Sequence, residues 1–167
     1  MGSGRSGIAP KVGRPYMPGY GMMFMKGKGP LDWKWASDRL ANAHNYWLTT
    51  VCSDGRPHVM PIWGVWIDSA FYFSTGRRSR NSLNLKMNGN CIVCPEDARE
   101  AVILEGAASE VNDSHLCKRF LEVYKKKYDW DIDADGELIY AVRPRKAFGF
   151  IENGECVQGN PTRWRFD

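Results

Sequence analysis

The sequence predicts one mainly β domain with a few helices, spanning residues 31–167 behind an N-terminal arm. A chain of 167 residues is long enough for one ordinary hydrophobic core, and a hydrophobic content of 43% argues against a disordered chain. Short runs rich in β-branched and aromatic residues recur from residue 46 onward and are separated by turn residues. Helical spacing of apolar residues is confined to a few stretches.

The strongest local signal is a β-hairpin. Residues 46–52 alternate and are rich in aromatic and β-branched side chains, and residues 58–66 resume the strand pattern. The turn between them, residues 53–56, contains Asp-Gly, the pair that favours tight hairpin turns. After a second turn, a strand over 71–73 leads to Ser74-Thr75-Gly76.

The segment after this strand has the outline of an anion-binding site. A short helix runs to Met87, and the residues that introduce it are Arg77-Arg78-Ser79-Arg80-Asn81. Hydroxyls and free backbone N–H groups at a helix start, with guanidinium groups beside them, suit a phosphate by geometry and charge. A solvated basic loop capped by Ser79 is the alternative.

Two longer helices are predicted on either side of this region. Residues 31–44 carry apolar residues at helical spacing, with Asp32 as a cap. Asp113 opens a second helix whose apolar face includes Phe120 and Tyr124, and whose lysines, at 118 and 125–127, are expected to lie largely in solvent.

The remaining runs are predicted as strands over 101–111, 138–142 and 146–151. Cys91 and Cys94 lie in a further strand-like run, and their odd spacing sends the two side chains to opposite faces. No second pair or nearby histidine completes a metal set, so we predict no metal site.

The basic character of the chain belongs to its first 30 residues. The net charge is +4, yet residues 1–30 hold five basic residues and no acidic one, which leaves 18 basic and 19 acidic residues in the rest. This Gly- and Met-rich arm is expected to be irregular chain that wraps a partner subunit, contacts an anionic cofactor tail, or is simply loose. Its bases are sparse, so we expect no nucleic-acid binding.

The scattered, odd-numbered cysteines and the absence of an apolar run long enough to span a membrane predict a cytoplasmic protein with reduced thiols and no membrane contact.

Taken in order, the segments WLTTV, SDGRPHVMPIWGVW, FYFSTGRRSRNSLNL, AVILEGAASEV and TRWRF resemble the pyridoxamine 5'-phosphate oxidase-like superfamily of flavin and deazaflavin split β-barrels. The resemblance implies a homodimer of six-stranded split β-barrels of the FMN-binding type, with a cofactor in each groove between the subunits. It also implies an FMN-dependent oxidoreductase that transfers hydride through the flavin.

The resemblance assigns site residues to three segments. The second strand lays its backbone along the flavin ring, and the next strand with its following turn holds the ribityl phosphate. For the C-terminal tail, a Trp between two Arg favours a packing anchor from the residues alone, and the resemblance adds the alternative that the tail reaches the cofactor groove. The candidate cofactor-binding residues are Met60, Pro61, Ile62, Trp63, Ser74, Thr75, Arg78, Ser79, Arg80, Asn81, Trp164 and Arg165.

One departure from the family pattern concerns Asn81, because relatives often carry lysine at this place. An amide still donates a hydrogen bond, but the positive charge is lost. The sequence identifies no catalytic residue. Two alternatives stay open beside the FMN enzyme and its unidentified small-molecule redox substrate: a reductase using the 8-hydroxy-5-deazaflavin coenzyme, and a non-catalytic flavin- or haem-binding module.

Overall fold

The computed structural model describes residues 9–19, 29–133, 135–152 and 159–166, and it confirms the mainly β fold. Three helices and nine strands, all paired antiparallel, make up this part of the chain. In chain order the elements are β1 (Lys11–Gly13), α1 (Trp33–Asn42), β2 (Tyr46–Val51), β3 (Pro57–Ile62), β4 (Val65–Ile67), β5 (Ala70–Gly76), α2 (Arg80–Met87), β6 (Asn90–Pro95), β7 (Glu100–Glu110), α3 (Ser114–Tyr128), β8 (Glu137–Ile151) and β9 (Gly159–Arg165).

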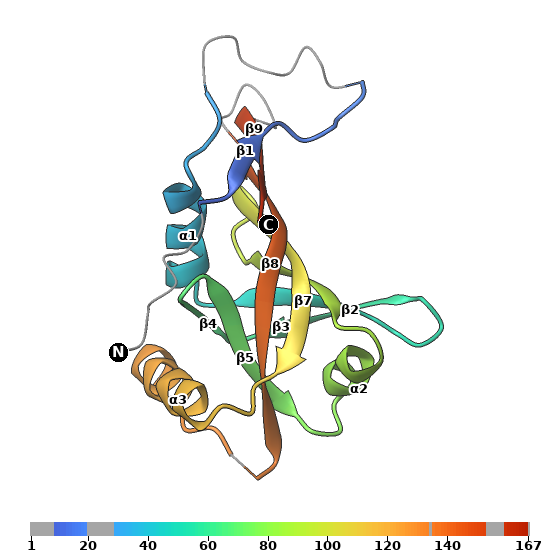
Figure 1. Ribbon diagram of the computed structural model, residues 1–167, viewed down its shortest axis with the longest axis vertical. Coiled ribbons are helices and arrows are strands. Elements are labelled where there is room, and N and C mark those ends of the chain that lie inside the picture. Colours follow the sequence, from blue (N-terminus) through green and yellow to red (C-terminus); the bar gives the residue numbers. More distant parts are fainter. Residues whose placement is uncertain (1–8, 20–28, 134, 153–158, 167) are drawn as a thin grey trace.

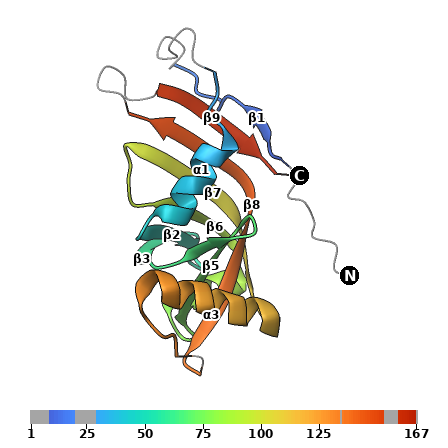
Figure 2. The same cartoon turned by 90° about the vertical axis from the view of Figure 1, so that its left-hand side faces the viewer.

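Strand β8 is the axis of the sheet (Figures 1 and 2). Its first half pairs with β5, its second half pairs with β9, and β7 pairs along both halves. From β7 the sheet continues through β6 and β2 to β3, which is an edge strand. The sheet therefore forks at β8, as a split barrel requires. No strand in the described part of the chain pairs with the outer edge of β3.

The predicted strands 138–142 and 146–151 are one continuous strand, so the expected interruption was wrong. Glu105 pairs with Lys146 while Gly106 pairs with Pro144, which leaves Arg145 as the extra residue of a bulge. A proline cannot donate a ladder hydrogen bond, and a bulge is a place where a strand accommodates one. The bulge falls between the half of β8 that pairs with β5 and the half that pairs with β9.

The predicted strand over 58–66 breaks after Ile62, and this expectation was also wrong. Gly64 lies against the next hairpin so closely that an added Cβ would be 2.2 Å from Cζ of Phe71 and 2.7 Å from the carbonyl oxygen of Tyr72. Its backbone N–H donates to the hydroxyl of Tyr128 at 3.0 Å rather than to a neighbouring strand. The chain therefore turns at Trp63 and Gly64 and restarts as β4.

We expect Gly64→Ala to lower the free energy of unfolding by about 1–3 kcal/mol, because the new methyl group overlaps a buried ring and a carbonyl. Gly29→Ala is the matched control, since an added Cβ there meets nothing within 4 Å. Urea unfolding of both variants measures the difference. Equal midpoints for the two would contradict the close packing at Gly64.

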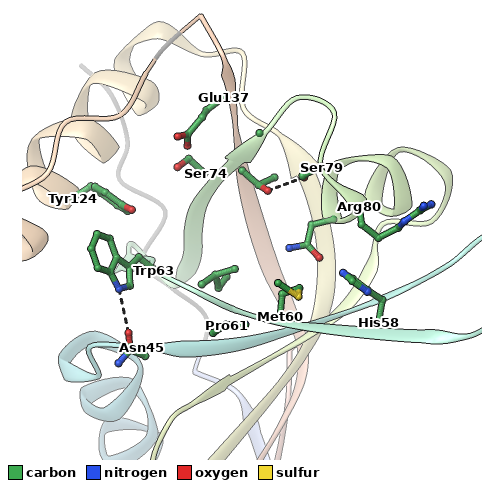
Figure 3. A pocket seen from close by; sticks show the side chains of 14 residues that line it. Asn45, His58, Met60, Pro61, Trp63, Ser74, Ser79, Arg80, Tyr124 and Glu137 are labelled. Atoms are coloured by element: carbon green, nitrogen blue, oxygen red, sulfur yellow. Dashed lines mark hydrogen bonds between the residues drawn. The ribbon is translucent and has the colours of Figure 1, made fainter.

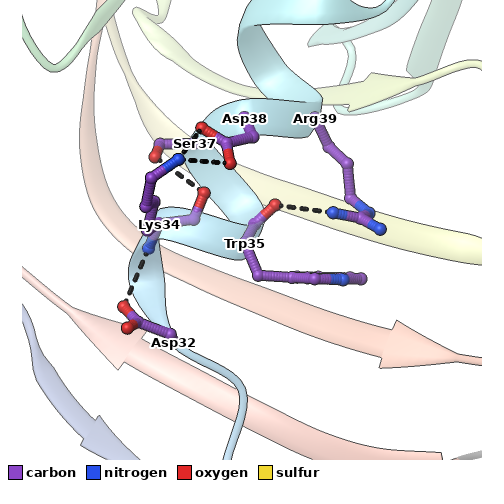
Figure 4. Close-up of polar contacts among 6 residues, drawn as sticks. All are labelled: Asp32, Lys34, Trp35, Ser37, Asp38 and Arg39. Atoms are coloured by element: carbon purple, nitrogen blue, oxygen red, sulfur yellow. Dashed lines mark hydrogen bonds and ion pairs between the residues drawn. The ribbon is translucent and has the colours of Figure 1, made fainter.

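Helix α1 confirms the predicted helix and its cap (Figure 4). The Asp32 carboxylate accepts from the backbone N–H of Lys34 at 2.9 Å, and the Lys34 ammonium pairs with Asp38 one turn later at 2.7 Å. Arg39 donates to the carbonyl of Trp35 at 3.0 Å and lies over its ring. The buried face of α1 packs against β4, β6 and β7.

Two hydrophobic clusters hold the fold together. The main core fills the space between the sheet and α1 and includes the fully buried side chains of Tyr46, Phe71 and Trp164. A second cluster lies under α3, where Phe120 and Tyr124 pack on β4 and β5 as the apolar spacing of that helix predicts. None of the described helices is long and apolar enough to cross a membrane.

The arm and the tail meet in the sheet. Residues 11–13 form β1, which pairs with β9, so the arm is not irregular throughout its described part. Residues 1–8 and 20–28 of the arm lie outside the described residues. On β6, Cys91 is buried and Cys94 is half-buried on the opposite face, and burial raises the pKa of these thiols to about 12 and about 11.

Candidate functional site

A cavity of about 700 Å³ lies between the free edge of β3, the end of β5 and the start of α2 (Figure 3). Helix α3 and the first residue of β8 close it on a further side. The lining residues are Asn45, His58, Met60, Pro61, Ile62, Trp63, Ser74, Thr75, Gly76, Ser79, Arg80, Asn81, Tyr124 and Glu137.

The fold brings nine of the twelve predicted site residues to this one cavity. They come from β3 and the residue after it, from the end of β5, and from the start of α2. The nine are Met60, Pro61, Ile62, Trp63, Ser74, Thr75, Ser79, Arg80 and Asn81.

The other three predicted residues lie elsewhere in this chain. Arg78 is exposed on the turn before α2 and does not line the cavity. Trp164 is fully buried in the main core, in edge contact with Trp33 at 5.4 Å, so its indole has no surface left for a ligand. Arg165 follows it on β9, exposed and paired in register with Lys11 and Lys146.

One end of the cavity, which we call the phosphate end, consists of Thr75, Ser79, Arg80 and Asn81. Ser79 is the N-cap of α2: its hydroxyl accepts from the N–H of Ser82 at 3.1 Å and shares a hydrogen bond with the Thr75 hydroxyl at 2.8 Å. The backbone N–H groups of the first helical residues, Arg80 and Asn81, have no acceptor within a helix. They make this end suited to an anion. Arg80 adds a positive charge at the same helix start, with its guanidinium directed away from the two hydroxyls (Figure 3).

The Asn81 side chain is 6% exposed, and its carbonyl oxygen is buried without a hydrogen-bond partner in the described part of the chain. A buried acceptor without a partner costs free energy, so a ligand hydroxyl or N–H beside the phosphate would relieve that cost. Rotation of the Asn81 amide by half a turn exchanges its oxygen and its NH₂ group. The side chain can therefore also donate a hydrogen bond to a ligand.

Strand β3 forms the long wall of the cavity. Among the described strands it pairs only with β2, which leaves the backbone groups of its other edge without a strand partner there. His58, Met60 and Ile62 lie on one face of the strand at a period of two residues. This alternation was the available signal for His58, which the sequence analysis did not select.

Trp63 ends this wall in a fixed orientation. Its ring stacks on Tyr128 with centroids 4.7 Å apart and planes 7° from parallel, and His44 meets its edge. Its indole N–H donates to Asn45 at 3.1 Å (Figure 3). The ring is 37% exposed, so part of it remains available to a ligand.

Lys127 lies behind this wall and is not on the solvated face that the sequence predicted. Its ammonium donates to the Tyr46 hydroxyl at 2.8 Å and to the Gly64 carbonyl at 3.1 Å. The Tyr128 hydroxyl donates to the same carbonyl at 2.8 Å. Burial lowers the pKa of Lys127 to about 8, because few charged groups there compensate for lost hydration. Hydrogen bonds from Lys127 and Tyr128 thus hold the end of α3 against the turn that carries Trp63.

We expect the free energy of unfolding to depend on pH because the Lys127 amine is buried. A lysine whose pKa is about 8 when folded and about 10.5 when unfolded loses its proton first in the folded state. Between these values the unfolded chain binds more protons, so the contribution of Lys127 to stability rises with pH. The stability of the parent minus that of Lys127→Met should therefore increase from pH 7 to pH 10, measured by urea unfolding. A difference that stays constant with pH would contradict the burial of the amine.

The outer face of the sheet at β2 and β3 is apolar, and the described residues leave it exposed. Trp47 is 47% exposed and Val59 is 52% exposed, and the register places them on neighbouring strands of the same face. A hollow of about 420 Å³ continues this face toward β7 and β8. Exposed apolar surface of this kind, next to a cavity, is typical of an interaction face.

Sequence comparison identifies the family. The model of the family described as pyridoxamine 5'-phosphate oxidase matches residues 36–151, which is more than half of the chain. The chain belongs to this family. The match contains every lining residue of the cavity and the β8 bulge, but neither β1 nor β9. No curated protein matches this chain in sequence.

Solved structures of the same fold carry several different descriptions. A structure described as F420 reductase is 21% identical, with a TM-score of 0.56, over 66% of this chain and 94% of its own. The heme storage protein HutZ from Vibrio cholerae is 19% identical, with a TM-score of 0.60, over 72% of this chain and 93% of its own. General stress protein 26 of Bacillus anthracis is 20% identical, with a TM-score of 0.59, over 70% of this chain and 91% of its own. These likenesses establish the fold, and the descriptions do not agree on one ligand.

Proposed function

We propose that this chain is an FMN-binding oxidoreductase whose cofactor occupies the cavity beside β3. The observation that supports the proposal best is the phosphate end, where two hydroxyls and a helix N-terminus meet at one side of a long groove and Arg80 is the first helical residue. Ser79, Thr75 and Arg80 would hold the phosphate. The buried Asn81 amide fits the same ligand, because a ribityl hydroxyl can donate to its unpaired oxygen.

The isoalloxazine ring would lie along β3, against Met60, Pro61 and Ile62. A strand with an unpaired edge offers backbone N–H and C=O groups to the polar rim of such a ring, and the apolar side chains exclude water from its face. The flavin, when bound, supplies the hydride-transfer chemistry. The protein residues bind it, orient it and shield it.

We propose further that the chain works as a homodimer. The exposed Trp47 and Val59 face borders the cavity through β3, so a second copy seated on it would bury the apolar surface and deepen the groove. The solution mass, measured by light scattering, distinguishes a dimer from a monomer.

Two other ligands remain candidates at the same cavity. A deazaflavin coenzyme has a similar three-ring system, with carbon in place of one ring nitrogen, and a ribityl phosphate, and one structure of this fold is described as F420 reductase. Haem is favoured by a different observation: His58 lines the cavity, and histidine is a common ligand of haem iron. A haem storage protein shares the fold.

The experiment that tests the proposal is titration of the purified protein with FMN, the deazaflavin coenzyme and haemin in parallel. Tight FMN binding with a two-banded flavin spectrum, followed by turnover with a reductant, is expected. Preference for the deazaflavin would make the chain a deazaflavin-dependent reductase. A haem spectrum that is lost in His58→Ala, with no flavin bound, would overturn the proposal in favour of a haem-binding module.

A further inference from the structure

The cavity has a second end, away from Arg80 and His58, where oxygen atoms gather (Figure 3). We call it the acidic end and define it by Ser74, Tyr124 and Glu137 above the ring of Trp63. Ser74 comes from β5, the strand that also supplies Thr75 to the phosphate end, whereas Tyr124 comes from α3 and Glu137 from β8, which supply no residue to that end.

The three oxygen-bearing side chains of the acidic end lie on the same side of the cavity (Figure 3). Glu137 pairs in register with Gly76, and Ser74 lies two residues before Gly76 on the same face of β5. The pKa of Tyr124 is raised to about 12, mainly by burial, next by Tyr128 and then by the negative charge of Glu137. The Tyr124 ring in turn approaches that of Trp63, with centroids 6.5 Å apart.

These groups have no partners of their own in the described part of the chain. Glu137 uses its backbone N–H for the carbonyl of Asp133, but its carboxylate makes no ion pair or hydrogen bond there. The hydroxyls of Ser74 and Tyr124 are likewise without a hydrogen bond. The carboxylate offers only acceptors and each hydroxyl adds lone pairs beside it, so the cavity presents several acceptors and one negative charge to a ligand.

The ring of Trp63 offers an aromatic surface next to the oxygen atoms of the acidic end. It is held by the stacked Tyr128 and by Asn45, so its exposed face keeps one orientation. An aromatic face attracts both a flat ring and a positive charge.

We propose that the acidic end binds the substrate through a positively charged, hydrogen-bond-donating group on a planar ring, such as an aromatic amine or amidine. The carboxylate of Glu137 pairs with the charge, Ser74 and Tyr124 accept its remaining N–H bonds, and Trp63 stacks on the ring. An aromatic carboxylate of the same size is excluded by charge. The proposal rests on the proposed function in one respect, namely that the phosphate end holds the flavin.

The test compares two probes of nearly equal shape, benzamidine and benzamide, by calorimetric titration of the FMN-loaded protein. Benzamidine should bind roughly tenfold tighter than benzamide, the scale of one charged hydrogen bond in a partly open site. Glu137→Gln should remove most of that preference. Glu122→Gln removes the same charge from an exposed position on α3 and should keep it.

The outcomes separate the two proposals. Equal binding of the two probes by the parent protein, or an unchanged preference in Glu137→Gln, would overturn the acidic end as a cation subsite even if FMN binds tightly. The titration is repeated on the cofactor-free protein to test whether the acidic end binds a cation even if the chain binds no flavin. A benzamidine preference there, with no FMN binding in the parent, would leave the subsite standing and remove the flavin proposal.

Discussion

Trp164→Ala is expected to lower the free energy of unfolding by about 3–5 kcal/mol, the cost of removing a large aromatic side chain from a close-packed core. The indole is fully buried, and it fills the space above Gly149, where an added Cβ would lie 2.6 Å from the ring. It also meets Trp33 edge-on at 5.4 Å. Its loss would therefore open a cavity between α1 and the second half of β8.

The measurement is urea unfolding followed by circular dichroism, because removing a tryptophan alters fluorescence directly. Trp130→Ala is the matched control, since that ring is 59% exposed and should cost less than about 1 kcal/mol. A loss below 1 kcal/mol for Trp164→Ala would contradict its place in the core and would reopen a role for the tail at the cofactor groove.

Arg80→Ala is expected to weaken FMN binding by about 1.5–3 kcal/mol, or roughly 10- to 150-fold in Kd, the scale of a lost hydrogen bond to a charged group. Arg80 lines the phosphate end and opens α2, so under the proposed function its guanidinium and the helix N-terminus would act on the same phosphate.

Arg78→Ala provides the control, because Arg78 is an exposed cation on the same turn that does not line the cavity. Its removal should change FMN affinity little at physiological salt, where distant charges are screened. Fluorescence quenching of FMN measures both affinities. Equal losses in the two variants would mean that the general positive charge of the turn, rather than the geometry at Arg80, attracts the cofactor.

Local signals in the sequence were sufficient for the helices and for much of the site. Asp32, Ser79 and Asp113 were recognisable as caps because a capping side chain acts within three residues of itself. The β3 wall and the phosphate end followed from the ordered resemblance to the family, and the fold brings both to one cavity.

The residues that the sequence analysis missed are those positioned by contacts between distant segments. Glu137 and Tyr124 reach the cavity only because β8 pairs with β5 and α3 packs over β4. Lys127 lies on the polar side of a helical pattern, yet its ammonium donates a hydrogen bond to the carbonyl of Gly64 in the turn after β3. Trp164 shows the opposite case: a tail residue assigned to the groove by resemblance is held in the core by its register with Ala147.

The most direct test of the central claim compares the affinities of FMN and riboflavin, which differ only by the phosphate, for the same protein. If the phosphate end binds the cofactor, FMN should bind at least about 100-fold tighter than riboflavin, as expected for the loss of several charged hydrogen bonds. Arg80→Ala should narrow that ratio by weakening FMN alone. Equal affinities for FMN and riboflavin would contradict the account, because the hydroxyls of Thr75 and Ser79 and the start of α2 would then have no part in holding the ligand.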